Sequence, residues 1–128
     1  MNRDLPSLPS SQQYREALSR LAEALPSNHL ALLRAHYRAP DHTATATDLA
    51  KAVGYQDYRG VNAQYGRLGT ILREALNYEE GGQESYIIAS FIPPGVNDNI
   101  DWLWVMHPEL AEALEQLGWV KDAERDEE

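Results

Sequence analysis

The segment from Thr45 to Leu76 constrains the fold most, because it carries signals for two helices joined by a tight turn. Thr45 and Asp48 have the spacing of a capping box, in which a hydroxyl and a carboxylate three residues later satisfy backbone amides at a helix start. Gly54 can take the left-handed conformation that ends a short helix. Residues 55–58 then form a turn before a longer helix. These parts, in this order, predict a helix-turn-helix unit.

The longer helix of this unit has one continuous apolar side. At 100° per residue, its large apolar side chains fall within a narrow arc that faces the core; they are Val61, Tyr65, Leu68, Leu72 and Leu76. With a scaffold helix ahead of it, the predicted unit spans residues 29–76. The same pattern also fits an ordinary packed pair of helices, and the pattern by itself does not separate the two.

Helical spacing also appears on both sides of the helix-turn-helix. Apolar residues recur every three or four positions in residues 14–25, where Pro26 stops the pattern, and again in residues 30–37. Further along, Pro108 occupies a favoured first helical position, and Gly118 follows the last apolar residue of that segment. We therefore expect two scaffold helices ahead of the short helix and a final helix near residue 110.

Between the long helix and the final one, the residue types change to those of β-strands. Residues 86–92 and 100–106 are rich in β-branched and aromatic side chains, and the loop over residues 93–99 separates them. They predict a β-hairpin in the position of a wing. The expected fold is mainly α with a β-hairpin (α+β), a winged helix-turn-helix-like domain over residues 1–120 followed by an acidic tail or linker over residues 121–128.

Charge is distributed unevenly along the chain. The net charge is −9, which argues against general binding to polyanions, because such binding depends on neutralising phosphates with Lys and Arg. Residues 29–76, however, carry six basic and four acidic side chains, whereas residues 77–128 carry two basic and thirteen acidic ones. The helix-turn-helix unit is therefore the most basic part of the chain.

No arrangement typical of a catalytic or metal centre appears in the sequence. The chain has no cysteine, which excludes disulfides, thiolate nucleophiles and cysteine-type zinc sites. Its four histidines are scattered, without the spacing of a metal site. His36 and His42 flank a turn, and they fit hydrogen-bonded or solvent-facing side chains better than ligands. We expect a protein that is not an enzyme and has no cofactor or metal.

The outward face of the long helix combines arginines with small residues. Opposite the apolar arc lie Arg59, Ala63, Gly66, Arg67, Thr70 and Arg73, with Gly60 and Asn62 at the margins. Small residues let a partner approach closely, and arginine donates forked hydrogen bonds to phosphates or guanine. Asn62 or Gln64 would pair with adenine, Lys51 with the DNA backbone, and Tyr58 would stack on bases or enter the core. An ordinary exposed helix face is the alternative interpretation.

Two tryptophans stand out in the second predicted strand. Trp102 and Trp104 are two residues apart and therefore share one side of the strand with Ile100 and Met106. Most often such a pair packs a hairpin onto neighbouring helices. The alternative is an aromatic pocket for a flipped or modified base, since base recognition often uses aromatic stacking.

Several stretches of the chain resemble a domain found at the front of some bacterial nucleases of the HNH type. The similar stretches are residues 33–40, 45–55, 62–69, 104–114 and 118–120, so the resemblance covers most of residues 30–120. The His-Asn-His motif of the cutting domain is absent from this sequence. The resemblance therefore implies a targeting or recognition module, or a stand-alone relative, in a restriction or defence setting.

Two functions fit these observations. The first is non-catalytic recognition of double-stranded DNA, including modified or foreign DNA, in which Lys51, Tyr58, Arg59, Asn62, Arg67 and Arg73 contact the duplex; a homodimer is compatible with it. The second is an acidic interaction or inhibitor domain whose residues 77–128 mimic nucleic acid toward a basic protein. No apolar run reaches the length that spans a bilayer, so we expect no membrane partner and a cytoplasmic location.

Overall fold

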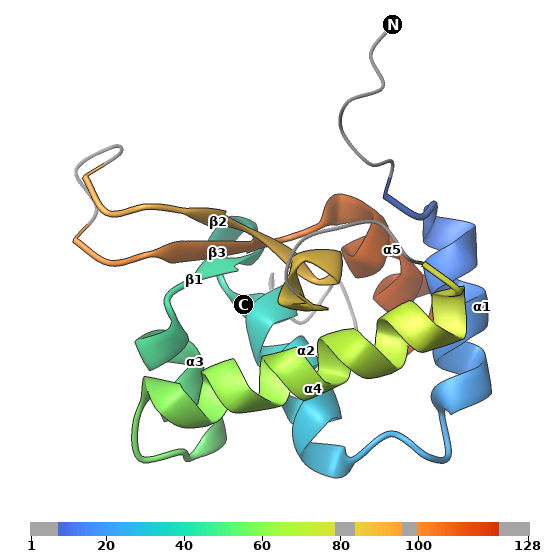
Figure 1. The fold of residues 1–128 in the computed structure, drawn as a ribbon, viewed down its shortest axis with the longest axis horizontal. Coiled ribbons are helices and arrows are strands. Elements are labelled where there is room, and N and C mark those ends of the chain that lie inside the picture. Colours follow the sequence, from blue (N-terminus) through green and yellow to red (C-terminus); the bar gives the residue numbers. More distant parts are fainter. Residues whose placement is uncertain (1–7, 79–83, 96–99, 121–128) are drawn as a thin grey trace, which may run out of the picture.

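The computed structural model describes residues 8–78, 84–95 and 100–120, where five α-helices and two short 3-10 helices accompany a three-stranded antiparallel sheet (Figure 1). The elements are α1 (Ser11–Leu21), α2 (Ser27–Arg38), η1 (Pro40–His42), β1 (Thr43–Ala44), α3 (Ala46–Val53), α4 (Tyr58–Leu76), η2 (Glu84–Ile87), β2 (Ala89–Ile92), β3 (Leu103–Met106) and α5 (Pro108–Leu117). The predicted class, mainly helical α+β, is confirmed.

Local signals define both ends of α3. The Thr45 hydroxyl accepts a hydrogen bond from the Asp48 amide at 3.0 Å, and the Asp48 carboxylate accepts one from the Thr45 amide at 3.3 Å, so the predicted capping box is present. Gly54 has φ +89°, and its amide donates to the Ala50 carbonyl. Asp57 then caps α4, so the turn between the two helices is short.

The apolar arc of α4 is buried as predicted. Val61, Tyr65, Leu68 and Leu72 are fully buried, while Leu76, at the end of the helix, is half-buried against the core. α4 packs against α3, α1 and η2, and α2 passes behind it in the view of Figure 1. Because the core takes only one side of α4, the opposite side faces outward from Arg59 to Thr70.

Two glycines in α4 have opposite environments. A Cβ atom on Gly69 would lie 2.3 Å from the carbonyl oxygen of Glu84 in η2, whereas a Cβ atom on Gly66 would meet nothing within 4 Å. Gly69 thus permits η2 to pack directly on the helix backbone. At Gly66, by contrast, no neighbouring atom requires the absence of a side chain.

We therefore expect substitutions at these two glycines to change stability in opposite directions. Gly69→Ala should lower the free energy of unfolding by about 2 kcal/mol, because the added methyl group overpacks the contact with η2. Gly66→Ala should raise it by about 1 kcal/mol, since alanine favours a helix interior. Urea unfolding of both variants measures the difference, and changes of the same sign would contradict the packing described.

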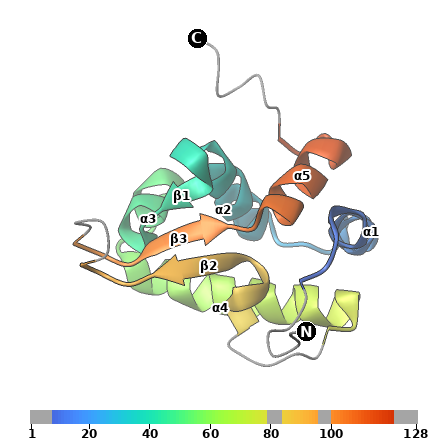
Figure 2. The ribbon, with the colours of Figure 1, turned by 90° about the horizontal axis from the view of Figure 1, so that it is seen from above.

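The sheet joins the helix pair to the hairpin. The strand order is β1-β3-β2, with Thr43 opposite Val105 and Ala44 opposite Trp104 (Figure 2). β1 connects α2 with α3 and was not predicted, because two residues are too few to show an alternating pattern. Through β1, the start of α3 is fixed against the hairpin.

The hairpin is present, but both of its strands are shorter than predicted. The expected strand over residues 86–92 begins only at Ala89, because Glu84–Ile87 form η2. Ile87 and Ile88 are both buried, which a strand with one solvent-facing side does not allow for successive residues. The Tyr14 hydroxyl also donates to the Ile87 carbonyl at 2.8 Å and holds that carbonyl away from the sheet.

The second expected strand, over residues 100–106, begins only at Leu103. Leu103 pairs with Ile92, so the next position would place Trp102 opposite Pro93, which has no amide to donate. Ile100 is consequently 90% exposed and does not share a buried side with Trp104 and Met106.

The final helix ends as the sequence predicts. Gly118 has φ +77°, its amide donates to the Glu115 carbonyl, and the Trp119 amide donates to the Leu114 carbonyl at 3.1 Å. The Trp119 ring is half-buried against the core. The predicted acidic tail over residues 121–128 lies outside the described residues, as do residues 96–99 of the predicted loop.

Candidate functional site

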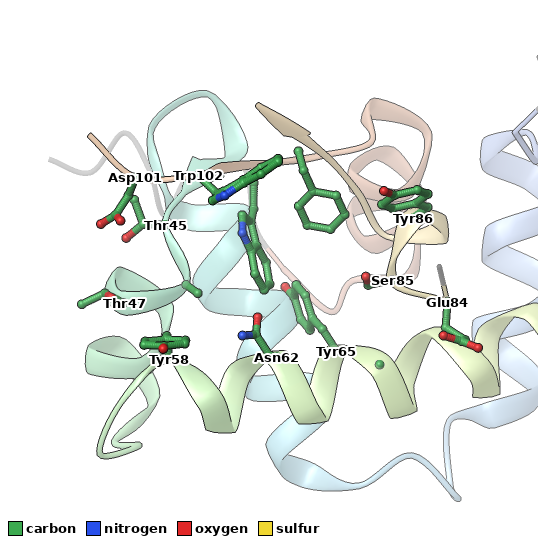
Figure 3. A pocket seen from close by; sticks show the side chains of 14 residues that line it. Thr45, Thr47, Tyr58, Asn62, Tyr65, Glu84, Ser85, Tyr86, Asp101 and Trp102 are labelled. Atoms are coloured by element: carbon green, nitrogen blue, oxygen red, sulfur yellow. The ribbon is translucent and has the colours of Figure 1, made fainter. Parts of the chain in front are cut away.

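The predicted site residues of α4 divide between two surfaces. Arg59 and Arg67 are exposed on the outward side of the helix, together with the small residues Ala63 and Thr70. Tyr58 and Asn62 instead line a cavity between α4 and the hairpin (Figure 3). Lys51 is exposed on α3. The structure thus offers a basic outward face and a separate, concave site beside it.

Arg59 is anchored at the start of α4. Its Nη2 lies 2.7 Å from the Asp57 carboxylate, and its amide also donates to Asp57. The hydrogen bonds of Arg59 lower the pKa of the Asp57 carboxyl. An exposed ion pair of this kind contributes little to stability.

Arg73 was expected on the outward face of α4, but its side chain is not exposed there. It is half-buried, and its guanidinium carbon lies 5.4 Å from the centre of the Tyr78 ring. The contact is a cation–π pair that secures the end of α4. Arg73 is therefore less exposed than Arg59 and Arg67 and already contacts an aromatic ring.

Gln64, which was predicted as the alternative to Asn62 for pairing with adenine, is hydrogen-bonded within the protein. Its side-chain oxygen lies 2.9 Å from Nε2 of the buried His29 on α2. Since the amide oxygen only accepts, the His29 nitrogen donates this bond. Asn62 is exposed and keeps its side chain directed at the cavity (Figure 3).

The concave site, which we term the aromatic cavity, has a volume of about 660 Å³. The start of α3, the side of α4, η2 and the hairpin enclose it (Figure 3). Its aromatic lining residues are Tyr58, Tyr65, Tyr86, Phe91, Trp102 and Trp104. Trp104 contacts Tyr65 and Phe91 with ring centres 5.4 and 5.1 Å apart, and Tyr86 contacts Phe91 at 5.3 Å. Four of the rings, Tyr65, Trp104, Phe91 and Tyr86, are therefore joined by successive contacts.

The two tryptophans have different roles in this surface. Trp104 is 7% exposed and packs the hairpin onto α4. This is the first of the two alternatives that the sequence left open for the pair. Trp102 precedes β3, is 51% exposed and lines the outer part of the cavity. The packing interpretation therefore holds for Trp104, whereas Trp102 is an exposed ring at the cavity.

A buried histidine positions the floor of the cavity. Nε2 of His36 lies 2.8 Å from the Trp104 carbonyl, and Nδ1 lies 2.8 Å from the Tyr65 hydroxyl. A carbonyl only accepts, so Nε2 carries the proton and Nδ1 accepts from Tyr65. Burial lowers the pKa of His36 to about 4 and raises the pKa of Tyr65 above its usual range. Neutral His36 thereby links α2, α4 and β3.

The expectation that His36 is a hydrogen-bonded or solvent-facing side chain is confirmed in its first form, but its position beneath the cavity was not predicted, although the sequence carries a signal for it. Leu33, His36 and Tyr37 are spaced at three and four residues, so His36 falls on the inward side of α2. His42 is also hydrogen-bonded, with Nδ1 2.7 Å from the Tyr37 carbonyl. Tyr86 and Phe91 gave no comparable signal, because only the fold brings them to α4.

The acidic groups of α5 lie apart from the outward face of α4. α5 carries Glu109, Glu112 and Glu115 and packs against α1, on the other side of β3 from α4 (Figure 2). Two other carboxylates, Asp101 and Glu84, line the aromatic cavity. The charged side chains that line the cavity are thus acidic, whereas the outward face of α4 carries the exposed Arg59 and Arg67 together with Glu74.

Within residues 8–78, 84–95 and 100–120, no three His, Cys, Asp or Glu side chains gather in a way that could hold a metal ion. No helix in the described part of the chain is long and apolar enough to cross a bilayer.

No family model, no curated protein and no solved structure matches the chain. What the site does must therefore follow from its own residues.

Proposed function

We propose that the chain is a winged helix-turn-helix module that binds double-stranded DNA through the outward face of α4. The supporting observation is the order of its elements: β1 lies between α2 and α3, α4 follows, and the hairpin of β2 and β3 closes the sheet against β1. In winged-helix domains, this order presents the second helix of the pair to the major groove and places the hairpin at its side.

The side chains of the outward face suit this role. Arg59 and Arg67 are exposed and lie about two turns apart on α4, and Ala63 and Thr70 between and beyond them are small. Arginine can bridge phosphates or donate two bonds to guanine, and small residues let the helix enter the groove. Lys51 on α3 supplies a third cation for the DNA backbone.

The uneven charge of the chain limits this binding to a small contact. Few cations are available, and α5, which carries Glu109, Glu112 and Glu115, packs against α1. A duplex that approached α5 would be repelled. The module would therefore bind in one orientation and with little affinity for other polyanions, as the proposed recognition role requires.

Fluorescence anisotropy of a labelled duplex tests this proposal directly. If Lys51, Arg59 and Arg67 each neutralise one phosphate, the logarithm of the binding constant should fall with the logarithm of the salt concentration with a slope of about −3. The same titration with a cytosine-methylated duplex measures whether base modification enters recognition.

Two results would contradict duplex binding. One is an anisotropy that stays constant at low salt, and the other is binding whose strength does not change with salt. If the chain does not bind the duplex but binds a purified basic protein in a salt-dependent manner, the acidic interaction domain becomes the better description.

A further inference from the structure

Most of the large hydrophobic side chains that are exposed in the described part of the chain line the aromatic cavity. In the described part of the chain, five large hydrophobic side chains are exposed, and three of them line this cavity: Tyr58, Tyr86 and Trp102, with exposed fractions of 50%, 45% and 51%. Exposed apolar surface costs about 25 cal/mol per Å² in water, and its concentration at one place marks a binding surface. The rings therefore favour an occupant that contacts aromatic faces.

All charged side chains that line the cavity are acidic. Asp101 lies at the end next to α3, Glu84 lies at the end next to η2, and no Lys, Arg or His side chain is among the described residues that line it (Figure 3). Carboxylates and the negative faces of aromatic rings both attract cations and disfavour phosphates. The cavity is thus suited to a ligand of opposite charge to the DNA backbone.

We propose that the aromatic cavity binds an organic cation with a fully alkylated nitrogen, a quaternary ammonium group. A primary ammonium needs several hydrogen-bond acceptors, whereas an alkylated one is stabilised by ring faces. The rings of the cavity that a ligand can reach are those of Tyr58, Tyr86 and Trp102, with the half-buried Phe91 beside them. Trp104 and the fully buried Tyr65, whose hydroxyl donates to His36, close the floor beneath them. This site goes beyond the duplex proposal and does not depend on it.

The size of the cavity agrees with such a ligand. Its volume of about 660 Å³ lies in the range of small-molecule sites and leaves space beyond a trimethylammonium head. Gly66 contributes to this space, because it lines the cavity and a Cβ atom there would meet nothing within 4 Å. The missing side chain, which costs the helix stability, keeps this part of the cavity open.

Calorimetric titration of the chain with choline tests the charge requirement. The matched control is the neutral alcohol in which a carbon atom replaces the choline nitrogen, so that only the charge differs. Choline is expected to bind about tenfold more tightly than this alcohol, because cation–π contacts with several rings are lost in the control. Equal binding of both compounds, or no heat from choline, would overturn the proposal.

Variants locate the binding in the cavity. Trp102→Leu removes an exposed ring, and Gly66→Leu fills the open space and keeps the ring positions and charges unchanged; each should reduce choline affinity at least about tenfold. Ile100→Ala, an exposed position of the same segment that does not line the cavity, should leave it unchanged. Undiminished binding in both Trp102→Leu and Gly66→Leu would place the cation elsewhere and overturn the assignment.

A second titration distinguishes the source of the cation. A short uncharged peptide with one trimethyllysine is compared with the same peptide carrying unmodified lysine and with choline. Tighter binding of the trimethyllysine peptide than of choline identifies a protein side chain as the ligand, and the reverse identifies a small molecule. If the unmodified lysine peptide binds best, the requirement for alkylation is wrong. Duplex binding is measured in a separate assay without choline, so the two proposals can fail independently.

Discussion

Between pH 7 and pH 4, the free energy of unfolding is expected to fall by about 3 kcal/mol through His36 alone. Burial lowers the pKa of His36 in the folded state to about 4, from 6.5 for an unperturbed histidine. Between these values the unfolded chain binds a proton that the folded chain does not. The stabilisation is therefore complete above pH 6.5 and is lost as the pH falls toward 4.

Urea unfolding at several pH values checks this prediction, with His36→Gln as the control. Glutamine has an amide that can donate to the Trp104 carbonyl but does not titrate. The variant should be less stable at pH 7, and its stability should change by less than that of the unsubstituted chain between pH 6.5 and pH 4. Identical pH dependence of the two proteins would show that His36 is not the titrating group.

Reversal of both exposed arginines of α4 is expected to reduce duplex affinity about 100-fold or more. A hydrogen bond to a charged group contributes about 1.5 kcal/mol, which corresponds to about tenfold in affinity. Arg59 and Arg67 lie about two turns apart on α4, so their losses should add. The Arg59→Glu/Arg67→Glu variant should keep its fold, because both side chains are exposed.

The matched control changes the net charge by the same amount elsewhere. Arg15→Glu/Arg34→Glu alters α1 and α2, where each arginine makes one exposed hydrogen bond, to Gln116 and to the Trp119 carbonyl. If the outward face of α4 is the contact surface, this variant should lose much less affinity, through long-range charge alone. Equal losses in the two double variants would mean that net charge, and not α4, governs binding.

Much of the fold follows from local chemistry that the sequence displays. The capping box of Thr45 and Asp48, the left-handed Gly54 and Gly118, and the apolar arc of α4 each act over a few residues, so their spacing was sufficient to predict them. Where long-range contacts decide the conformation, prediction was wrong. Residues 86 and 87 of the predicted strand belong instead to η2, whose first residue packs its backbone against Gly69 of α4.

The candidate site shows the same division. The exposure of Arg59 and Arg67 follows from the helical period of α4 alone, whereas the position of Arg73 depends on Tyr78, which lies beyond the end of the helix. The aromatic cavity combines side chains from α3, α4, η2 and the hairpin. In the sequence, only the spacing of Trp102 and Trp104 indicated an aromatic pocket, because the other rings come to the cavity through tertiary packing.

Amide chemical shifts of the isotope-labelled chain, recorded while a short duplex is added, test the proposed contact between the outward face of α4 and DNA. If α4 binds the duplex in this way, the largest changes should occur at Arg59, Ala63, Arg67 and Thr70, with further changes around Lys51 and the smallest on α1 and α5. Changes concentrated on α5, or spectra that the duplex leaves unaltered, would contradict it.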